Sequence, residues 1–145
     1  MNSSQASAAA PLNLAILIKL LRPRQWTKNL IAFAPILFAG RMLDGDALLH
    51  ASMCVVALCL ISGSVYVFND IIDVEADRKH PTKCKRPIAA NLVTVKAAII
   101  VASLSLLASF AIAYLVRPAL SLVLLAYLLL QAAYILKLKQ RIILD

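Results

Sequence analysis

Three aspartates near the middle of the chain have the types and the spacing of a metal–phosphate site. Asp70, Asp73 and Asp77 stand at positions i, i+3 and i+7 of the segment "NDIIDVEADRKH". On a continuous helix they lie within about 60° of one another along about 10 Å, with Asn69 beside them and Glu75 on the other side. Mg²⁺ binds one or two carboxylates together with substrate phosphates. The stripe therefore predicts a site for one or two Mg²⁺ ions and a bridging diphosphate.

A cluster of cations follows the aspartates, in "HPTKCKRP" at residues 80–87. Because proline ends the helix, Lys83, Lys85 and Arg86 can fold back over a phosphate whose charge the metal only partly cancels. The alternative is that these cations pair with the aspartates merely to finish a solvated helix end. The loop favours phosphate binding, and both interpretations stay open.

Weaker candidates lie on either side of this cluster. Lys28 and Asn29, in "RPRQWTKN" at residues 22–29, are candidates for substrate contact at the mouth of a cavity. The same stretch also suits a basic membrane anchor with an interfacial tryptophan. Tyr66, one turn before Asp70, is either a packing residue or a phenol donor to substrate.

The composition places these residues in a membrane protein. The chain has 145 residues, is 62% hydrophobic and carries a net charge of +8. Soluble domains are about 45–50% apolar, and basic loops of membrane proteins usually face the cytoplasm and its anionic lipids. No nucleic-acid-binding motif is present. Cys54, Cys59 and Cys84 lack the spacing of a metal site or a disulfide framework.

The hydropathy pattern predicts an all-α, multi-span transmembrane bundle within residues 12–145, after a disordered tail at 1–11. Residues 12–21 suit an interfacial helix. About four spans follow, at residues 27–43 (kinked at Pro35), 46–68, 91–116 and 118–138. The second of these continues helically to about Lys79, which makes it about 51 Å long against a hydrocarbon core of about 30 Å. The aspartates must therefore lie near a membrane surface.

The distribution of charge predicts which surface this is. Twelve of the fifteen Lys and Arg residues fall on one side of such a topology, with only Arg41 and Arg117 opposite and Lys96 within a span. Positive residues concentrate in cytoplasmic loops. We therefore expect a multi-pass protein of the inner (plasma) membrane whose aspartates face the cytoplasm.

The motif "NDIIDVEADR" resembles the first aspartate-rich motif, N-D-x-x-D-x-x-x-D, of the UbiA-type prenyltransferase superfamily, at Asn69, Asp70, Asp73 and Asp77. The flanking "RPRQWTKN" and "HPTKCKRPIAA" resemble the branch of decaprenyl-phosphate phosphoribosyltransferases. The resemblance runs from about residue 20 onward.

This resemblance implies a bundle of nine spans around a cavity open to lipid, of which this chain would supply the N-terminal half. It implies Mg²⁺ held by the three aspartates and a donor, phosphoribosyl pyrophosphate, bound by Asn69 and the cations. The acceptor would be a polyprenyl phosphate in the bilayer.

One departure from the family pattern limits the expectation. Family members carry a second aspartate-rich motif in a C-terminal half, and this sequence contains none, so the site is expected to be incomplete here. The alternatives are prenyl transfer from a prenyl diphosphate to an aromatic or lipid acceptor, and an inactive or scaffold membrane fragment.

Overall fold

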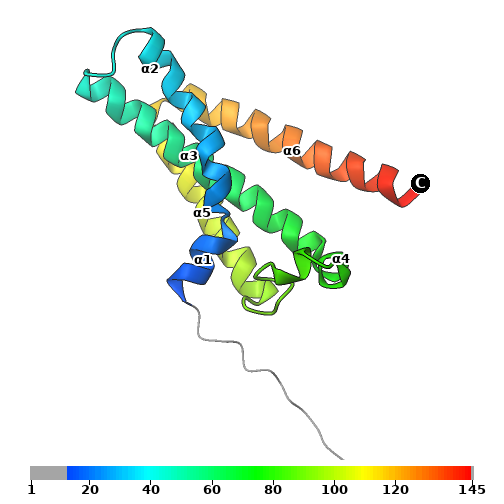
Figure 1. Ribbon diagram of the computed structural model, residues 1–145. Coiled ribbons are helices and arrows are strands. Elements are labelled where there is room, and N and C mark those ends of the chain that lie inside the picture. The colour runs from blue at the N-terminus through cyan, green and yellow to red at the C-terminus, as the bar shows by residue number, and fades with distance from the viewer. Residues whose placement is uncertain (1–12, 145) are drawn as a thin grey trace, which may run out of the picture.

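The helices of the chain run largely along one long axis, with the N-terminal segment laid against the longest of them (Figure 1). The computed structural model describes residues 13–144, and side chains for residues 13–137. The tail predicted for residues 1–11 lies outside this described part.

The N-terminal segment combines two short α-helices with a long 3-10 helix. Helix α1 (Leu14–Leu20) begins at Asn13, whose side chain accepts a hydrogen bond from the backbone N–H of Ala15. The 3-10 helix η1 (Pro23–Phe33) and α2 (Ala34–Phe38) follow. The prediction of one kinked α-helical span at residues 27–43 is therefore wrong, because residues 27–33 belong to the 3-10 helix and only Ala34–Phe38 is α-helical. Pro35 lies in the first turn of α2, where its missing N–H costs no hydrogen bond.

Three helices are long and apolar enough to cross a membrane, among the residues that the structure describes. They are α3 (Gly45–Ile72), α5 (Val95–Val116) and the Pro118–Lys137 part of α6 (Pro118–Leu144). Asp44 and Thr94 cap the first two by accepting hydrogen bonds from backbone N–H groups of the first turn. These three spans confirm the predicted multi-span helical membrane fold.

The helix carrying the aspartates is interrupted, contrary to the prediction that it continues to Lys79. Helix α3 ends at Ile72, Asp73 leaves the helical region (φ −92°, ψ 6°), and α4 spans Val74–Lys79. The backbone still bonds with helical spacing across the break, from Asp73 N to Asn69 O (3.0 Å) and from Asp77 N to Asp73 O (2.8 Å). The break therefore disturbs the stripe without separating its two ends. A short 3-10 turn, η2 (Lys83–Lys85), follows in the loop.

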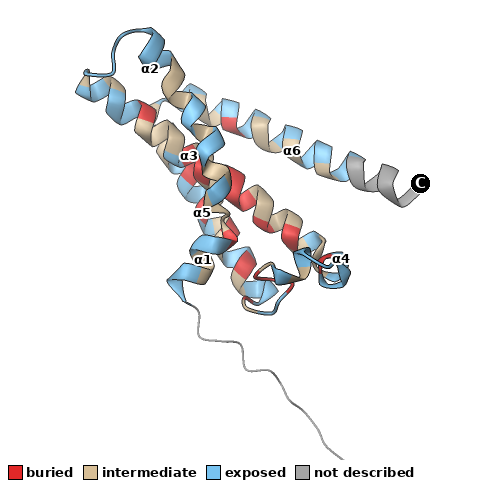
Figure 2. Cartoon of the chain, in the orientation of Figure 1, coloured by how far each residue is buried: buried red, intermediate tan, exposed pale blue. Residues whose placement is uncertain are grey.

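Helices α3 and α5 form the core of the bundle, where buried residues concentrate (Figure 2). Helix α5 meets α3 with a stripe of small side chains: Ala98, Ala102, Ser105, Ser109 and Ala113. Two serines link the helices, because Ser64 Oγ donates to Ala102 O (3.0 Å) and Ser109 Oγ donates to Ala57 O (2.7 Å). Small residues and hydroxyls of this kind let membrane helices approach closely.

Helix α6 packs on this pair near its start, through the buried Leu124, and then diverges from it (Figure 1). Much of its surface is exposed leucine and valine, as expected for a face toward lipid or further helices.

Candidate functional site

Two of the three aspartates share one arginine at the end of the bundle. Arg86 Nη1 donates to Asp70 Oδ1 (3.1 Å) and to Asp77 Oδ2 (2.7 Å). The side chains of Asp70 and Asp77 are only 3% and 4% exposed, whereas that of Arg86 is 25% exposed. Buried carboxylates need such partners, since an unpaired buried charge is strongly destabilising. The loop after α4 therefore folds back onto the aspartates, and Arg86 makes the ion pairs named in the alternative interpretation, here with buried carboxylates.

A second arginine reaches Asp70 from the N-terminal segment. Arg22 Nη2 donates to Asp70 Oδ1 at 2.5 Å. Its guanidinium carbon lies 4.9 Å from the centre of the Tyr66 ring, one helical turn before Asp70 on α3. A cation in this position is attracted by the face of the ring. Two sequence segments 48 residues apart thus meet at one carboxylate.

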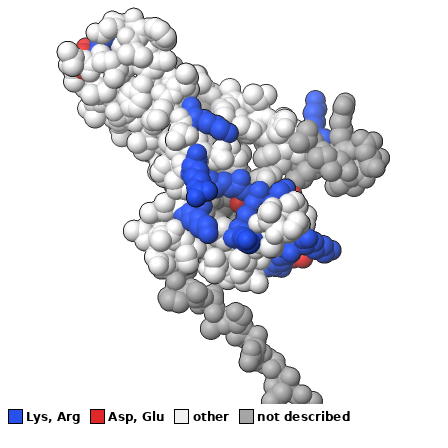
Figure 3. Space-filling model, in the orientation of Figure 1, with Lys and Arg blue, Asp and Glu red and all other residues white. Residues whose placement is uncertain are grey.

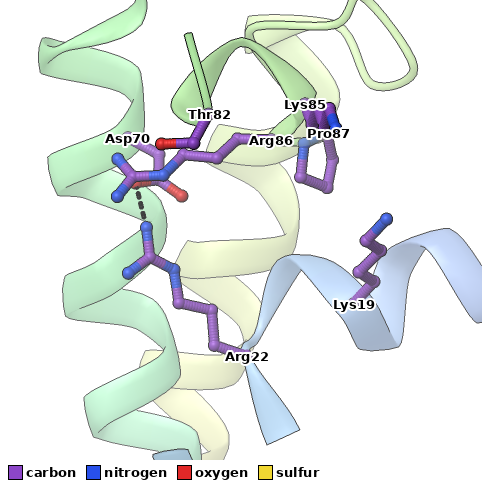
Figure 4. A pocket seen from close by; sticks show the side chains of 7 residues that line it. All are labelled: Lys19, Arg22, Asp70, Thr82, Lys85, Arg86 and Pro87. Atoms are coloured by element: carbon purple, nitrogen blue, oxygen red, sulfur yellow. Dashed lines mark hydrogen bonds and ion pairs between the residues drawn. The ribbon is translucent and has the colours of Figure 1, made fainter. Parts of the chain in front are cut away.

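A pocket of about 270 Å³ lies between these elements, and Figure 4 shows its lining. The residues that line it are Lys19, Arg22, Asp70, Thr82, Lys85, Arg86 and Pro87. Four of them are cationic and one is acidic. In Figure 3, lysine and arginine side chains gather around a hollow on this face of the molecule. The excess of positive charge suits a ligand with several negative charges.

The local backbone explains how Arg22 reaches the pocket. Arg22 has a positive φ of 54°, a left-handed conformation that non-glycine residues rarely adopt. The turn before it packs against Gly63 of α3, where an added Cβ would lie 3.1 Å from both Leu21 O and Leu21 Cδ2. Trp26 Nε1 also donates to Leu21 O (3.1 Å). A glycine on α3 and an indole on η1 thus both contact Leu21, the residue before Arg22.

The predicted residues divide into those that meet at the pocket and those that do not. Asp70, Lys85 and Arg86 line it, and Asp77 joins them through Arg86. Tyr66 contacts Arg22. Asp73 and Asn69 are half-buried and do not line the pocket, and Asp73 makes further interactions of its own.

Three predicted substrate-binding residues lie away from the pocket lining. Lys28 and Lys83 are exposed. The Asn29 amide points to α3, where its Nδ2 lies 3.3 Å from Ser62 Oγ and 3.4 Å from Cys59 Sγ. Ser62 precedes Asp70 by eight residues, or about 12 Å along a helix. This contact holds η1 against α3.

The sequence reasoning missed four lining residues: Lys19, Arg22, Thr82 and Pro87. Arg22 lies in "RPRQWTKN", but the residues of that stretch predicted to contact substrate are Lys28 and Asn29. Its role depends on a tertiary contact with an aspartate far along the chain, which helical periodicity does not reveal.

No group of three His, Cys, Asp or Glu side chains is close enough to hold a metal ion within the described part of the chain. In this structure the neighbours of Asp70 and Asp77 are guanidinium groups. Glu75, the acid on the opposite side of the stripe, is instead exposed and pairs with Arg78 (2.9 Å). The contrast between buried and exposed acids follows the predicted helix face.

The fold and the site define an integral membrane helical protein with a pocket lined mainly by cationic side chains at one end of its bundle. The chain belongs to the UbiA prenyltransferase family, whose model matches residues 29–145.

Several of its relatives are named decaprenyl-phosphate phosphoribosyltransferase. The one from Mycolicibacterium smegmatis is 41% identical over 98% of this chain and 46% of its own length. The one from Mycobacterium tuberculosis H37Rv is 42% identical over 93% of this chain and 46% of its own. That from Corynebacterium glutamicum is 43% identical over 59% and 26% respectively. The chain thus spans about half the length of the curated relatives it matches.

Proposed function

We propose that the full-length protein transfers a 5-phosphoribosyl group from phosphoribosyl pyrophosphate to a polyprenyl phosphate, at the cytoplasmic face of the membrane. The observation that carries this proposal is the pocket in which Lys19, Arg22, Lys85 and Arg86 surround the buried Asp70. The names of the relatives support the same donor and acceptor.

The charge of the pocket favours this donor over a prenyl diphosphate. Phosphoribosyl pyrophosphate carries a 5-phosphate in addition to the diphosphate that both donors share. Four lining cations exceed what a diphosphate alone requires, and arginine binds phosphate through paired N–H donors. Prenyl transfer remains the second candidate, because the family takes its name from that reaction.

The carboxylates fit a divalent cation. Asp70 and Asp77 direct oxygens at one common nitrogen of Arg86, so their donors already converge on a position suited to positive charge. Carboxylate oxygens are hard ligands of the kind Mg²⁺ takes. We propose that Asp70 and Asp77, with Asp73 beside them, hold Mg²⁺, which when bound supplies Lewis-acid stabilisation of the diphosphate leaving group.

The protein's own residues then bind and orient the donor. Arg22, Arg86 and Lys85 bind phosphate oxygens and stabilise charge that develops as the diphosphate leaves the anomeric carbon. A phosphate oxygen of the lipid forms the new bond to that carbon as the bond to diphosphate breaks. A phosphate anion is already nucleophilic, so no general base is required.

The remaining predicted residues take secondary parts in this proposal. Lys28 and Lys83 are exposed cations outside the lining, and we assign them long-range attraction of the anionic donor. Asn69 and Tyr66 both precede Asp70 on α3, and Tyr66 contacts the Arg22 guanidinium.

The donor can be tested directly with full-length protein in membranes, supplied with Mg²⁺, polyprenyl phosphate and labelled phosphoribosyl pyrophosphate. The expected result is a labelled lipid that forms only when both substrates are present. A parallel reaction offers labelled prenyl diphosphate and an aromatic acceptor. Product from the second reaction and none from the first would establish the second candidate, and no product from either would favour a scaffold.

A further inference from the structure

We infer that Arg22 is a phosphate-binding residue that exchanges partners: it is held on Asp70 while the pocket is empty and moves to a donor phosphate when cation and donor bind. This inference rests on the proposed function for the class of donor, and it needs only that the ligand carries a diphosphate. It adds Arg22 to the predicted site and couples the binding of the cation to the binding of the diphosphate, neither of which the sequence pattern predicts.

The contacts around Arg22 hold its side chain toward the pocket and Asp70. Its left-handed backbone is a conformation that persists only where neighbouring structure enforces it, and such residues cluster at binding sites. Gly63 and Trp26 both contact Leu21 and so restrain the backbone directly before Arg22. The Tyr66 ring then supports the guanidinium at 4.9 Å. A cation that served only to anchor the chain to lipid would need none of these contacts.

The pairing with Asp70 can be exchanged without stranding a buried charge. Asp70 has two arginine partners on the same oxygen, Arg22 at 2.5 Å and Arg86 at 3.1 Å. The Arg22 side chain is 24% exposed and lines the pocket, so a ligand there reaches it directly. When Arg22 leaves, Arg86 still compensates the charge of Asp70 until a divalent cation binds the two carboxylates.

The exchange makes cation and anion binding depend on each other. In the empty pocket Arg22 competes with a divalent cation for Asp70, because both are positive ligands of one carboxylate. A bound diphosphate draws Arg22 away and so removes the competitor. Such coupling is reciprocal, so the cation strengthens diphosphate binding by the same factor.

The test compares Arg22→Gln with wild type in the full-length protein in nanodiscs. Mn²⁺ binding without any anion is measured by electron paramagnetic resonance. Binding of inorganic pyrophosphate at saturating Mn²⁺ is measured by calorimetry. Arg22→Gln is expected to tighten Mn²⁺ binding about threefold to tenfold and to weaken pyrophosphate binding about tenfold or more.

Arg24→Gln is the matched control, since Arg24 is an exposed cation two residues further along and outside the lining. It should change neither constant by more than about twofold, the size of effect expected for an exposed residue. Arg22→Lys, which keeps the charge, should restore part of the pyrophosphate affinity. Tyr66→Leu leaves Arg22 in place and should shift both constants in the direction of Arg22→Gln.

Opposite shifts of the two constants support the exchange, because a residue that only stabilises the fold would weaken both. Mn²⁺ binding that is unchanged or weaker in Arg22→Gln overturns the inference, as does unchanged pyrophosphate binding. Should Arg22→Gln fail to fold, the same criteria apply to Tyr66→Leu. Because pyrophosphate is common to both candidate donors, the result does not depend on which donor the transfer assay identifies.

Discussion

Asp70 is nearly closed off from solvent, and at the residue scale its surroundings determine what the site can do. The Asp70 side chain is 3% exposed and forms ion pairs with two arginines, which balance its negative charge in this structure. Removing one partner of a buried ion pair costs about 3–5 kcal/mol. A ligand that draws an arginine away from Asp70 therefore requires another positive charge beside the carboxylate. A divalent cation provides that charge, which is why we expect cation and donor to bind together.

Lys85 tests the pocket at a residue that is not buried. Lys85→Ala should raise the KM for phosphoribosyl pyrophosphate about fivefold to tenfold, since one charged contact to phosphate is worth about 1–1.5 kcal/mol here. The kcat should change less, because the lysine contacts the donor before and during transfer. Steady-state kinetics of the full-length protein measure both.

Lys79→Ala is the control for this comparison, because Lys79 is an exposed cation of the same region that does not line the pocket. Equal increases of KM in the two variants would show that general positive charge, and not the lining, binds the donor.

At the scale of the elements, the close approach of the N-terminal turn to α3 brings Arg22 into the site. Gly63→Ala would place a methyl group 3.1 Å from the backbone oxygen of Leu21. Gly45→Ala, at the start of the same helix, meets nothing within 4 Å. The helix-propensity gain of about 1 kcal/mol applies to Gly63 in the helix interior and is smaller at Gly45 in the first turn, so a lower stability of Gly63→Ala must come from the contact.

Thermal unfolding in detergent should show Gly63→Ala less stable than Gly45→Ala, by about 1–3 kcal/mol for an overpacked contact. The affinity for pyrophosphate should fall in Gly63→Ala alone. Equal stability and equal affinity in the two variants would mean that the turn does not need the glycine.

The same elements show which parts of the fold and of the site the sequence predicts. The spans of α3, α5 and α6 followed from apolar length, and the shared face of Asp70 and Asp77 followed from helical spacing. The break at Asp73 and the 3-10 geometry of η1 did not, because both depend on packing against other elements. Arg22 was missed for the same reason, since its partner lies 48 residues away.

At the scale of the whole molecule, Asp70 of the pocket lies near the end of α3, whereas the loop containing Arg41 directly precedes the start of this helix, whose course Figure 1 shows. The orientation proposed from the basic residues therefore assigns the pocket end to the cytoplasm. Cys84, in the loop beside the pocket, reports on that end.

In the full-length protein, replacing Cys54, Cys59 and every cysteine outside residues 1–145 by Ala leaves Cys84 as the single thiol. A membrane-impermeant maleimide should label it in inverted membrane vesicles and not in intact spheroplasts. Arg41→Cys, placed in the same variant after Cys84→Ala, should show the opposite pattern. Labelling of Cys84 from outside would reverse the proposed topology.

The most direct test of the central claim, that the buried carboxylates serve donor binding and transfer, uses the labelled-lipid assay with three variants of full-length protein. Asp70→Asn and Asp77→Asn remove buried acids, and Glu75→Gln removes the exposed acid between them. We expect transfer to fall about 100-fold or more in both Asn variants, with excess Mg²⁺ restoring little, since about 2.7 kcal/mol of stabilisation is lost. Glu75→Gln should keep wild-type activity. Transfer at the wild-type rate in Asp70→Asn or Asp77→Asn would contradict the account.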